Sequence, residues 1–218
     1  MSKHWRDKLD LSIQKGFARF FFNPSPMIDN HFRRVENEKI VFVVQVSQGP
    51  IFSLNEDCVG VSLFLGLKYL PIENLYRELL LGYKADSLDV KTFWTTGAPM
   101  ASLSSVEFRF CKQMTKEQWQ AELDHLFNSF EEVALPYFKE NANEEFLLKV
   151  ADRQMIGRDG RDLYYKRPVQ LFVAGKRAEA LKLAEKTLSE IEAGQIEMVA
   201  KRYKSFLENL TKAESIMS

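Results

Sequence analysis

The chain has 218 residues, enough for one large domain or for a domain with a sizeable appendage. Hydrophobic residues make up 45% and charged residues 28% of the sequence, which is typical of a globular protein and excludes a disordered one. The 30 basic and 30 acidic side chains cancel, which argues against a protein dominated by the electrostatics of nucleic acids or membranes.

The N-terminal third predicts a helix followed by a β-hairpin. Residues 3–16 form an amphipathic helix in this prediction, because Trp5, Leu9 and Ile13 recur every four residues. The aromatic segment FARFFF then leads to the breaker NPSP. Residues 32–35 and 39–47 flank the turn ENE and predict two paired strands.

The middle of the chain predicts two more strands and a helix between them. CVGVSLFLGL alternates large apolar residues with small ones, and its small face would allow close approach by a helix. LPIENLYRELLLG predicts a helix that starts near Pro71 and stops at Gly82. SLSSVEFRFC predicts a half-buried strand whose wet face carries Arg109.

The remainder predicts helices. TKEQ is a capping box with Thr115 as the N-cap, and Pro136 is expected to end that helix. Its predicted buried stripe is Trp119, Leu123, Leu126, Phe127, Phe130 and Val133. Another helix is expected after Asn143, a short turn from Pro168, and then an antiparallel hairpin of helices over 176–193 and 195–211.

This order of elements predicts an α+β fold, an antiparallel sheet packed with helices and followed by a C-terminal helical hairpin. We expect a sheet domain over residues 1–156, a linker over 157–167 and a helical extension over 168–218. The linker contains GRDGRD and basic residues up to Lys166 and Arg167, beside Tyr164 and Tyr165. Deleting the extension is expected to leave a folded remainder.

The sequence contains no motif of a catalytic or cofactor-binding protein. There is no P-loop and no dinucleotide-binding glycine motif, and the three histidines and two cysteines are not spaced as zinc ligands. We therefore expect no cofactor and no metal. Cys58 and Cys111 could pair if their strands are neighbours, but free thiols are expected in a chain without a signal peptide, which we predict to be cytoplasmic.

Two candidate sites leave alternatives open. Gln45 and Ser47 end an apolar strand, where they line a pocket or satisfy the backbone of the next loop. Trp94 lies in the predicted loop FWTTGAP, where it is an interaction anchor if exposed and a core residue if buried. The eight acids against one lysine between Glu117 and Glu145 indicate a solvated helix face rather than a docking surface.

The ordered series HFRRV, IVFVVQVSQ, CVGVSLFLGL, a Trp loop and ALPYFKENANEEFLL resembles a bacterial domain-of-unknown-function family over about residues 5–150. Its markers here are Arg33 or Arg34, Gln45, Ser47, Trp94 and Leu135-Pro136. The resemblance implies no established reaction, and some relatives are suspected to be immunity or accessory proteins of toxin systems.

These observations favour a protein that acts by binding another protein, without catalysis, and an immunity protein is the most concrete form of this hypothesis. The predicted binding residues are Arg33, Arg34, Gln45, Ser47, Trp94 and Arg109. The alternative is an enzyme of unidentified class with a cleft on the sheet around Gln45, Ser47 and Arg109. Neither membrane nor nucleic acid is an expected partner.

Overall fold

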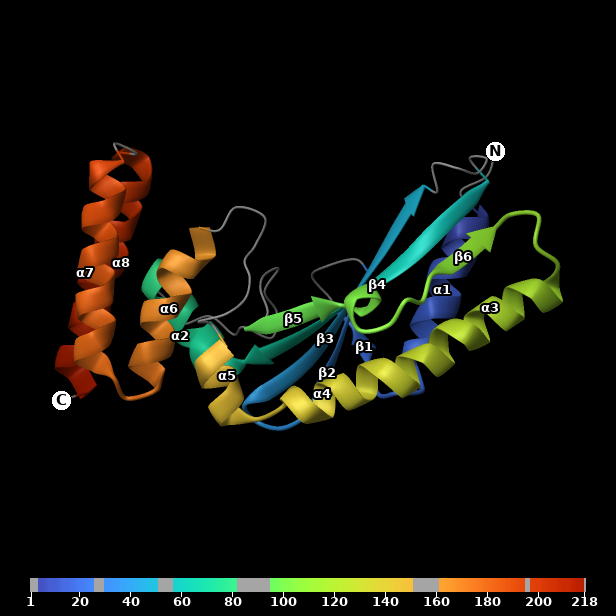
Figure 1. The fold of residues 1–218 in the computed structure, drawn as a ribbon, viewed down its shortest axis with the longest axis horizontal. Helices are drawn as coiled ribbons and strands as arrows, with labels where there is room; N and C mark the ends of the chain where they lie inside the picture. Colours follow the sequence, from blue (N-terminus) through green and yellow to red (C-terminus); the bar gives the residue numbers. More distant parts are fainter. Residues whose placement is uncertain are drawn as a thin grey trace. The chain divides into compact units, whose positions relative to one another are not determined.

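The structure is a computed structural model, and it describes residues 4–25, 30–50, 57–81, 95–150, 161–194 and 197–217. Helices and one six-stranded sheet form an α+β fold with helices at the C-terminal end, as predicted (Figure 1). Contacts divide the chain into two compact units. Unit 1 comprises Met1–Lys68 and Gly97–Ala142, and unit 2 comprises Tyr69–Thr96 and Asn143–Ser218.

The sheet is built on the predicted hairpin. Strands β1 (Asn23–Pro24), β2 (His31–Val35), β3 (Ile40–Pro50), β4 (Cys58–Tyr69) and β5 (Thr96–Pro99) follow one another in that order, and β6 (Phe108–Cys111) also pairs with β4. The helical turn η2 (Met100–Ser102) follows β5. In the β2–β3 hairpin, His31 lies opposite Gln45 and Val35 lies opposite Val41. Strand β6 is shorter than predicted, since pairing begins only at Phe108.

Helices of unit 1 cover one face of its strands. Phe17 of α1 (His4–Ala18) has its ring 4.8 Å from the ring of Phe32 on β2 and 5.5 Å from that of Phe127 on α3 (Lys116–Ser129). Phe110 of β6, which lies opposite Val59, contacts Trp119 of α3 at 5.3 Å. The helices therefore lie on the large-residue face of β4. The expected approach of a helix to its small-residue face stays a prediction.

The predicted end of the long helix at Pro136 is wrong. The capping box of Thr115 and Gln118 is present, but α3 continues through a π-helical turn (η3, Phe130–Ala134) into α4 (Leu135–Asn141), and the two helices follow one line in Figure 1. The wider turn places Pro136 in the first turn of α4, where its missing N–H breaks no helical hydrogen bond. It also shifts the buried stripe, so Ala134 is buried and Val133 is only half-buried.

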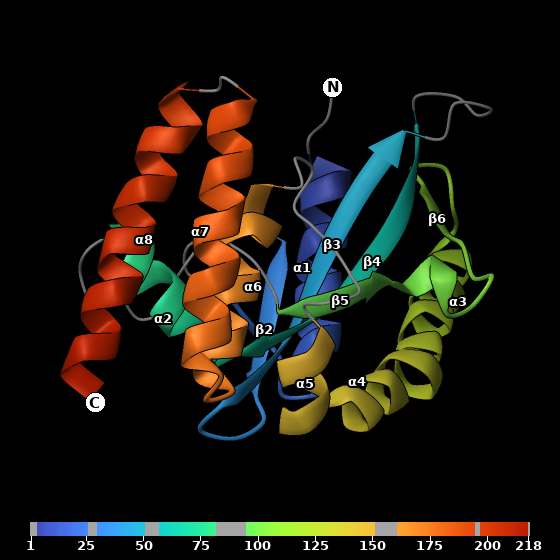
Figure 2. The ribbon, with the colours of Figure 1, turned by 60° about the vertical axis from the view of Figure 1, so that its left-hand side comes forward.

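Unit 2 is helical. It contains α2 (Leu70–Leu81), α5 (Glu144–Val150), α6 (Arg161–Val173), α7 (Arg177–Ala193) and α8 (Glu197–Met217). The predicted hairpin is confirmed, because α7 and α8 lie side by side (Figure 2) and its central residues are buried. Buried side chains of this hairpin are Ala184, Ile191, Tyr203, Phe206 and Leu210.

The structure differs from the predicted linker and from the predicted boundary at residue 156. Residues 161–167 belong to α6, which runs through Pro168 as one helix instead of beginning there as a short turn. Helix α2, expected within the sheet domain, clusters with the C-terminal helices. The physical reason is that Tyr76 and Leu79 of α2 belong to the same apolar core as Tyr165 of α6. Residues 157–160 lie outside the described part.

Candidate functional site

The C-terminus of α1 ends in a Schellman turn formed by phenylalanines. The N–H of Phe22 donates to the carbonyl of Phe17 at 3.2 Å, and the N–H of Phe21 donates to that of Ala18 at 3.1 Å. Phe21 takes the left-handed position of this motif, with φ +63°. Phe17 and Phe22 on either side are fully buried, which supplies the hydrophobic contact that accompanies such turns.

Phe21 is an unusual residue for this position of a Schellman turn. Glycine is the usual residue there, because the left-handed conformation costs an L-residue about 1–2 kcal/mol. The Phe21 side chain is 79% exposed, so burial of the ring does not offset this cost. Among the described residues, Phe21 is the aromatic residue with a positive φ, and its side chain is highly exposed.

Arg34, one of the predicted binding residues, holds this turn from β2. Its Nη1 donates to the carbonyl of Phe20 at 3.5 Å, and its guanidinium lies 5.5 Å from the ring of Phe22 and 4.9 Å from the ring of Phe42. Its Nη2 forms an ion pair of 2.8 Å with Glu36. These contacts fix Phe20 and Phe22, and with them the position of Phe21 between them. We call Phe20, Phe21, Phe22 and Arg34 the aromatic turn.

Four other predicted residues share a face of the sheet. Arg33 lies opposite Val43 and Gln45 lies opposite His31, so these side chains point away from the face of Phe32 and Phe42 that the helices cover. Ser47 has the same parity on β3, and Arg109 has the equivalent position on β6, opposite Gly60. Ser47 and Arg109 are exposed, whereas Arg33 and Gln45 are half-buried. The register thus places these four on the face opposite Arg34.

Trp94, the sixth predicted residue, lies outside the described residues, so both interpretations of it stay predictions. The marker pair Leu135-Pro136 is structural, since it lies where the π-helical turn meets α4. His125 is exposed, as expected, and its ring contacts Phe108 at 5.3 Å.

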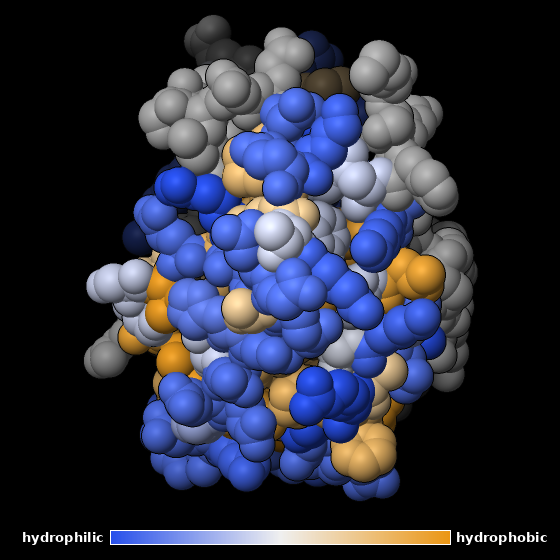
Figure 3. Space-filling view, turned by 90° about the vertical axis from the view of Figure 1, so that its right-hand side faces the viewer, coloured by the Kyte–Doolittle hydropathy of each residue, from blue (hydrophilic) through white to orange (hydrophobic). Residues whose placement is uncertain are grey.

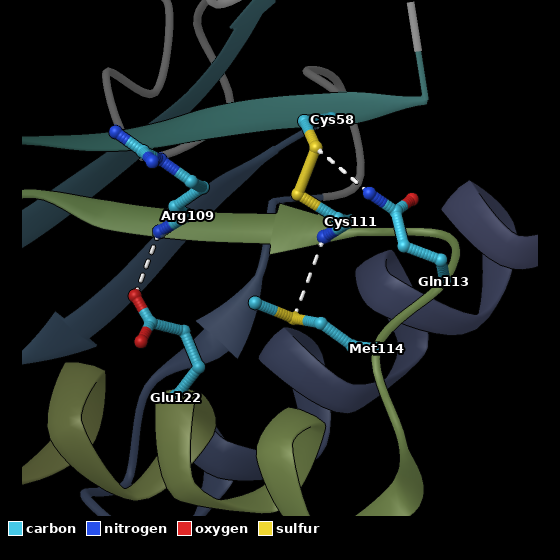
Figure 4. The surroundings of a disulfide bond; sticks show 6 residues. All are labelled: Cys58, Arg109, Cys111, Gln113, Met114 and Glu122. Carbon is cyan, nitrogen blue, oxygen red and sulfur yellow. Dashed lines mark hydrogen bonds between the residues drawn. A yellow bond between two sulfur atoms is a disulfide. The ribbon is translucent and has the colours of Figure 1, made fainter. Parts of the chain in front are cut away.

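Cys58 and Cys111 form a disulfide, so the expectation of free thiols is wrong. They are the first residue of β4 and the last of β6, and they lie directly opposite each other (Figure 4). From the sequence, the two cysteines could pair only if their strands are neighbours. The register of β4 and β6 shows that they are. Cytoplasmic location stays a prediction, and a disulfide is more typical of oxidising compartments.

Side chains accept the backbone hydrogen bonds of the outer edge of β6. The N–H of Arg109 donates to Oε1 of Glu122 on α3 at 2.7 Å, and the N–H of Cys111 donates to Sδ of Met114 at 3.5 Å (Figure 4). Both N–H groups face away from β4, and each has a partner. This edge is therefore protected against pairing with a strand of another chain.

Unit 2 contains a buried ionic cluster. Nζ of Lys166 lies 2.9 Å from both carboxylate oxygens of Glu73, and Oγ1 of Thr95 donates to Oε1 of Glu73 at 2.9 Å. The N–H of Tyr69 donates in turn to Oγ1 of Thr95 at 2.8 Å. Glu73 is 2% and Lys166 is 8% exposed, so the two charges compensate each other away from water. Lys166 is therefore a core residue rather than part of a basic linker.

The acidic stretch forms an exposed helix face. Glu117, Asp124, Glu131, Glu132 and Glu140 on α3, the π-helical turn and α4 are all exposed. Figure 3 views the side on which α3 and β6 lie in Figure 1, and most of that face is hydrophilic with small separate hydrophobic groups. A solvated helix face, the interpretation favoured by the sequence, accounts for this surface.

Among the described residues, no three His, Cys, Asp or Glu side chains gather in an arrangement that could hold a metal ion. None of the helices in the described ranges is both long and apolar enough to cross a membrane. No family model, curated protein or solved structure matches the chain. The candidate site therefore depends on the geometry of this chain.

The sequence contained a signal for the aromatic turn that residue-by-residue interpretation missed. Three consecutive phenylalanines, Phe20 to Phe22, cannot all point to the same side of a chain that leaves a helix. Such a run at the end of a helix indicates that one ring is left outside the core. The basic strand HFRRV predicted Arg34 as a binding residue, but only the structure shows that Arg34 positions the turn.

Proposed function

We propose that this protein binds another protein through the aromatic turn, with Phe21 as the anchor, and that binding is its function. The observation that carries the proposal is Phe21 itself, which is 79% exposed in a left-handed conformation that favours glycine. A residue that destabilises the free protein and contacts solvent is explained by a role outside the folding of its own chain.

The composition of the turn supports a protein partner. Aromatic residues and arginine dominate the energetic centres of protein interfaces, because they provide large contact area with few rotatable bonds. The turn is also preorganised, since the Schellman hydrogen bonds and Arg34 fix its backbone before any partner binds. An anchor of this kind loses little conformational entropy on binding.

The particular partner we propose is a bacterial toxin, with this protein as its immunity or accessory protein. The resemblance over residues 5–150 supports this part, and it remains a prediction. The exposed Arg19 next to the turn adds positive charge, whereas the charge of Arg34 is compensated by Glu36, so the partner surface would combine an apolar pocket with a carboxylate.

Site-specific photo-crosslinking tests the proposal. A benzophenone-bearing residue replaces Phe21 in the full chain in its cell of origin, and Leu11, which is 50% exposed on α1, provides the matched control position. We expect one discrete protein adduct from position 21 that is absent from position 11. The proposal fails if position 21 gives no adduct, or if both positions give the same products.

The variant Phe21→Gly then separates function from stability. Glycine removes the left-handed strain, so the free energy of unfolding should rise by about 1 kcal/mol. Loss of the anchor should weaken binding to the crosslinked partner by about 30-fold, the effect of a hot-spot side chain worth about 2 kcal/mol. Unchanged affinity in a stabilised variant would show that Phe21 is not the anchor.

A further inference from the structure

We propose that Cys58 and Cys111 form a reversible redox couple that a dithiol reduces in the folded protein. This inference is independent of the proposed binding function. It rests on the position of the pair in the sheet, on the groups around the two sulfur atoms and on the contacts that hold β6 without the disulfide.

The two cysteines occupy a pair of positions without mutual backbone hydrogen bonds. The N–H of Lys112 donates to the carbonyl of Asp57 at 2.8 Å, so the neighbouring pair 57 and 112 takes the hydrogen-bonded position. The N–H of Cys111 points away from Cys58 and donates to Met114. The disulfide thus joins facing side chains, and breaking it removes no ladder hydrogen bond from this pair.

The bond lies at one end of the pairing between β4 and β6. Cys58 is 4% and Cys111 is 7% exposed, but the residues beside them, Asp57, Lys112 and Gln113, are all exposed. The side chain of Gln113 lies over Cys58, with Nε2 donating to Sγ at 3.8 Å (Figure 4). We propose this exposed turn as the side from which a reductant reaches the sulfur atoms.

The surroundings favour Cys58 as the leaving group. A thiolate of the reductant attacks Sγ of Cys111, the S–S bond breaks, and its electron pair leaves on Sγ of Cys58, which accepts the hydrogen bond of Gln113. The second thiol of the reductant then displaces Cys111. One dithiol becomes a disulfide, and Cys58 and Cys111 become two thiols, so electrons and protons balance.

Strand β6 keeps its place after reduction. Phe108 and Phe110 are 3% and 0% exposed, and Phe110 contacts Trp119 of α3. The N–H of Arg109 donates to Oε1 of Glu122 on α3 at 2.7 Å. Because these contacts do not involve the disulfide, the reduced chain retains its fold, which a couple that cycles requires. Reduction loosens only the Cys58 end of the ladder and the turn that leads to Thr115, the N-cap of α3.

The test uses the full-length oxidised protein and dithiothreitol, without denaturant. Samples are quenched with N-ethylmaleimide at intervals, and intact mass counts the alkylated thiols while near-ultraviolet circular dichroism follows the tertiary structure. We expect both thiols to become alkylated with the dichroism unchanged, and glutathione disulfide to restore the original mass. Hydrogen exchange should accelerate at the amide of Lys112, which donates to the carbonyl of Asp57, and should not change at the amide of Phe110.

A second variant tests the assigned leaving group. Gln113→Ala removes the hydrogen bond to Sγ of Cys58 and should slow reduction about fivefold, the factor that one ordinary hydrogen bond contributes. Uncovering Cys58 does not offset this loss, because the reductant attacks Cys111 and Cys58 only leaves; a faster reduction would contradict this assignment. Lys149→Ala, an exposed residue of unit 2, should leave the rate unchanged. Alkylation that requires denaturant, or that proceeds only together with loss of the dichroism, would identify a permanent structural crosslink and overturn the proposal.

Discussion

The hydroxyl of Tyr203 on α8 donates a hydrogen bond of 2.8 Å to the carbonyl oxygen of Tyr164 on α6. That oxygen would normally accept the N–H of residue 168, but Pro168 has none. A side chain from another helix thus satisfies the carbonyl that a proline inside α6 leaves unpaired. Burial keeps the pKa of Tyr203 above its usual value, so the donor proton is retained.

A double-mutant cycle measures this relationship. Tyr203→Phe should lower the free energy of unfolding by about 1–2 kcal/mol, because it leaves a carbonyl unsatisfied in a packed helix. In the Pro168→Ala background, the loss of unfolding free energy caused by Tyr203→Phe should be about 1 kcal/mol smaller. The reason is that the new N–H of residue 168 donates to the carbonyl of Tyr164. Urea denaturation gives the four values. Tyr164→Phe, whose side chain is 48% exposed, is the control and should be neutral.

The ion pair of Glu73 and Lys166 predicts a second stability difference. Lys166→Met leaves a buried carboxylate without its counter-charge and should destabilise unit 2 by about 3–5 kcal/mol. Glu73→Leu combined with Lys166→Met should be less destabilising than Lys166→Met alone, because neither charge then remains. Thermal unfolding of these variants gives the comparison.

The exposed pair of Glu145 and Lys149 provides the control. Their side chains are 76% and 70% exposed, so Lys149→Ala should change the free energy of unfolding by less than about 0.5 kcal/mol. A loss at Lys166 no larger than this would show that the ionic cluster contributes little to the core of unit 2.

Features that depend on neighbouring residues were predictable from the sequence. The capping box at Thr115 and Gln118 and the β2–β3 hairpin are set by short spacings, and both were confirmed. Features that depend on distant partners were not. The π-helical turn before Pro136 forms because Phe130 and Phe138 both pack into the core, and Pro168 is tolerated because Tyr203 lies nearby.

The same distinction between neighbouring and distant partners applies to the candidate site. The strand HFRRV and the end of β3 identified Arg34, Gln45 and Ser47 by residue type, but their distribution over two faces follows only from the register. The disulfide required the pairing of strands 53 residues apart. The exposure of Phe21 depends on which of the phenylalanines pack between the sheet and the helices. No local sequence pattern specifies that choice.

Gly16 predicts a third effect at the crossing of α1 and α3. A Cβ atom at this position would lie 1.8 Å from Cζ of Phe127. Gly16→Ala should therefore destabilise unit 1 by about 1–3 kcal/mol, although alanine is the better helix former. Gly49→Ala is the control, since a Cβ there meets nothing within 4 Å. Denaturant midpoints of the two variants should differ clearly, and equal midpoints would contradict the close packing.

Alkaline pH should unfold the protein through its tyrosines. Burial and the hydrogen bond to Glu144 raise the pKa of Tyr69 from 10.0 to about 12, and burial alone raises that of Tyr137 to about 12. The folded state binds these protons more tightly than the unfolded state does. Their contribution to stability is therefore complete below pH 10 and is lost as the pH rises to about 12.

Urea midpoints measured at several pH values across this window test the expectation. The midpoint should fall as pH rises, and Tyr69→Phe should make that fall shallower because one of the titrating groups is gone. Tyr164→Phe, on an exposed ring, should leave the slope unchanged. A midpoint independent of pH between 10 and 12 would rule out tyrosine linkage.

Deletion of residues 168–218 tests how unit 2 is built, and the structure reverses the expectation from the sequence. The deletion removes α7, α8 and the end of α6, and with α8 a large part of the cover of α2, although Tyr165 and Lys166 at the start of α6 remain. Ile72, Tyr76 and Leu79 of α2 are at most 4% exposed in the intact chain, and Nδ2 of Asn209 donates to the carbonyl of Leu79 at 2.8 Å. The truncated chain should therefore expose an apolar helix and associate, visible as early elution in size-exclusion chromatography and as binding of a hydrophobic dye. A monomer that binds no dye would show that α2 needs no cover from the C-terminal helices, and the division of the chain into these two units would then be wrong.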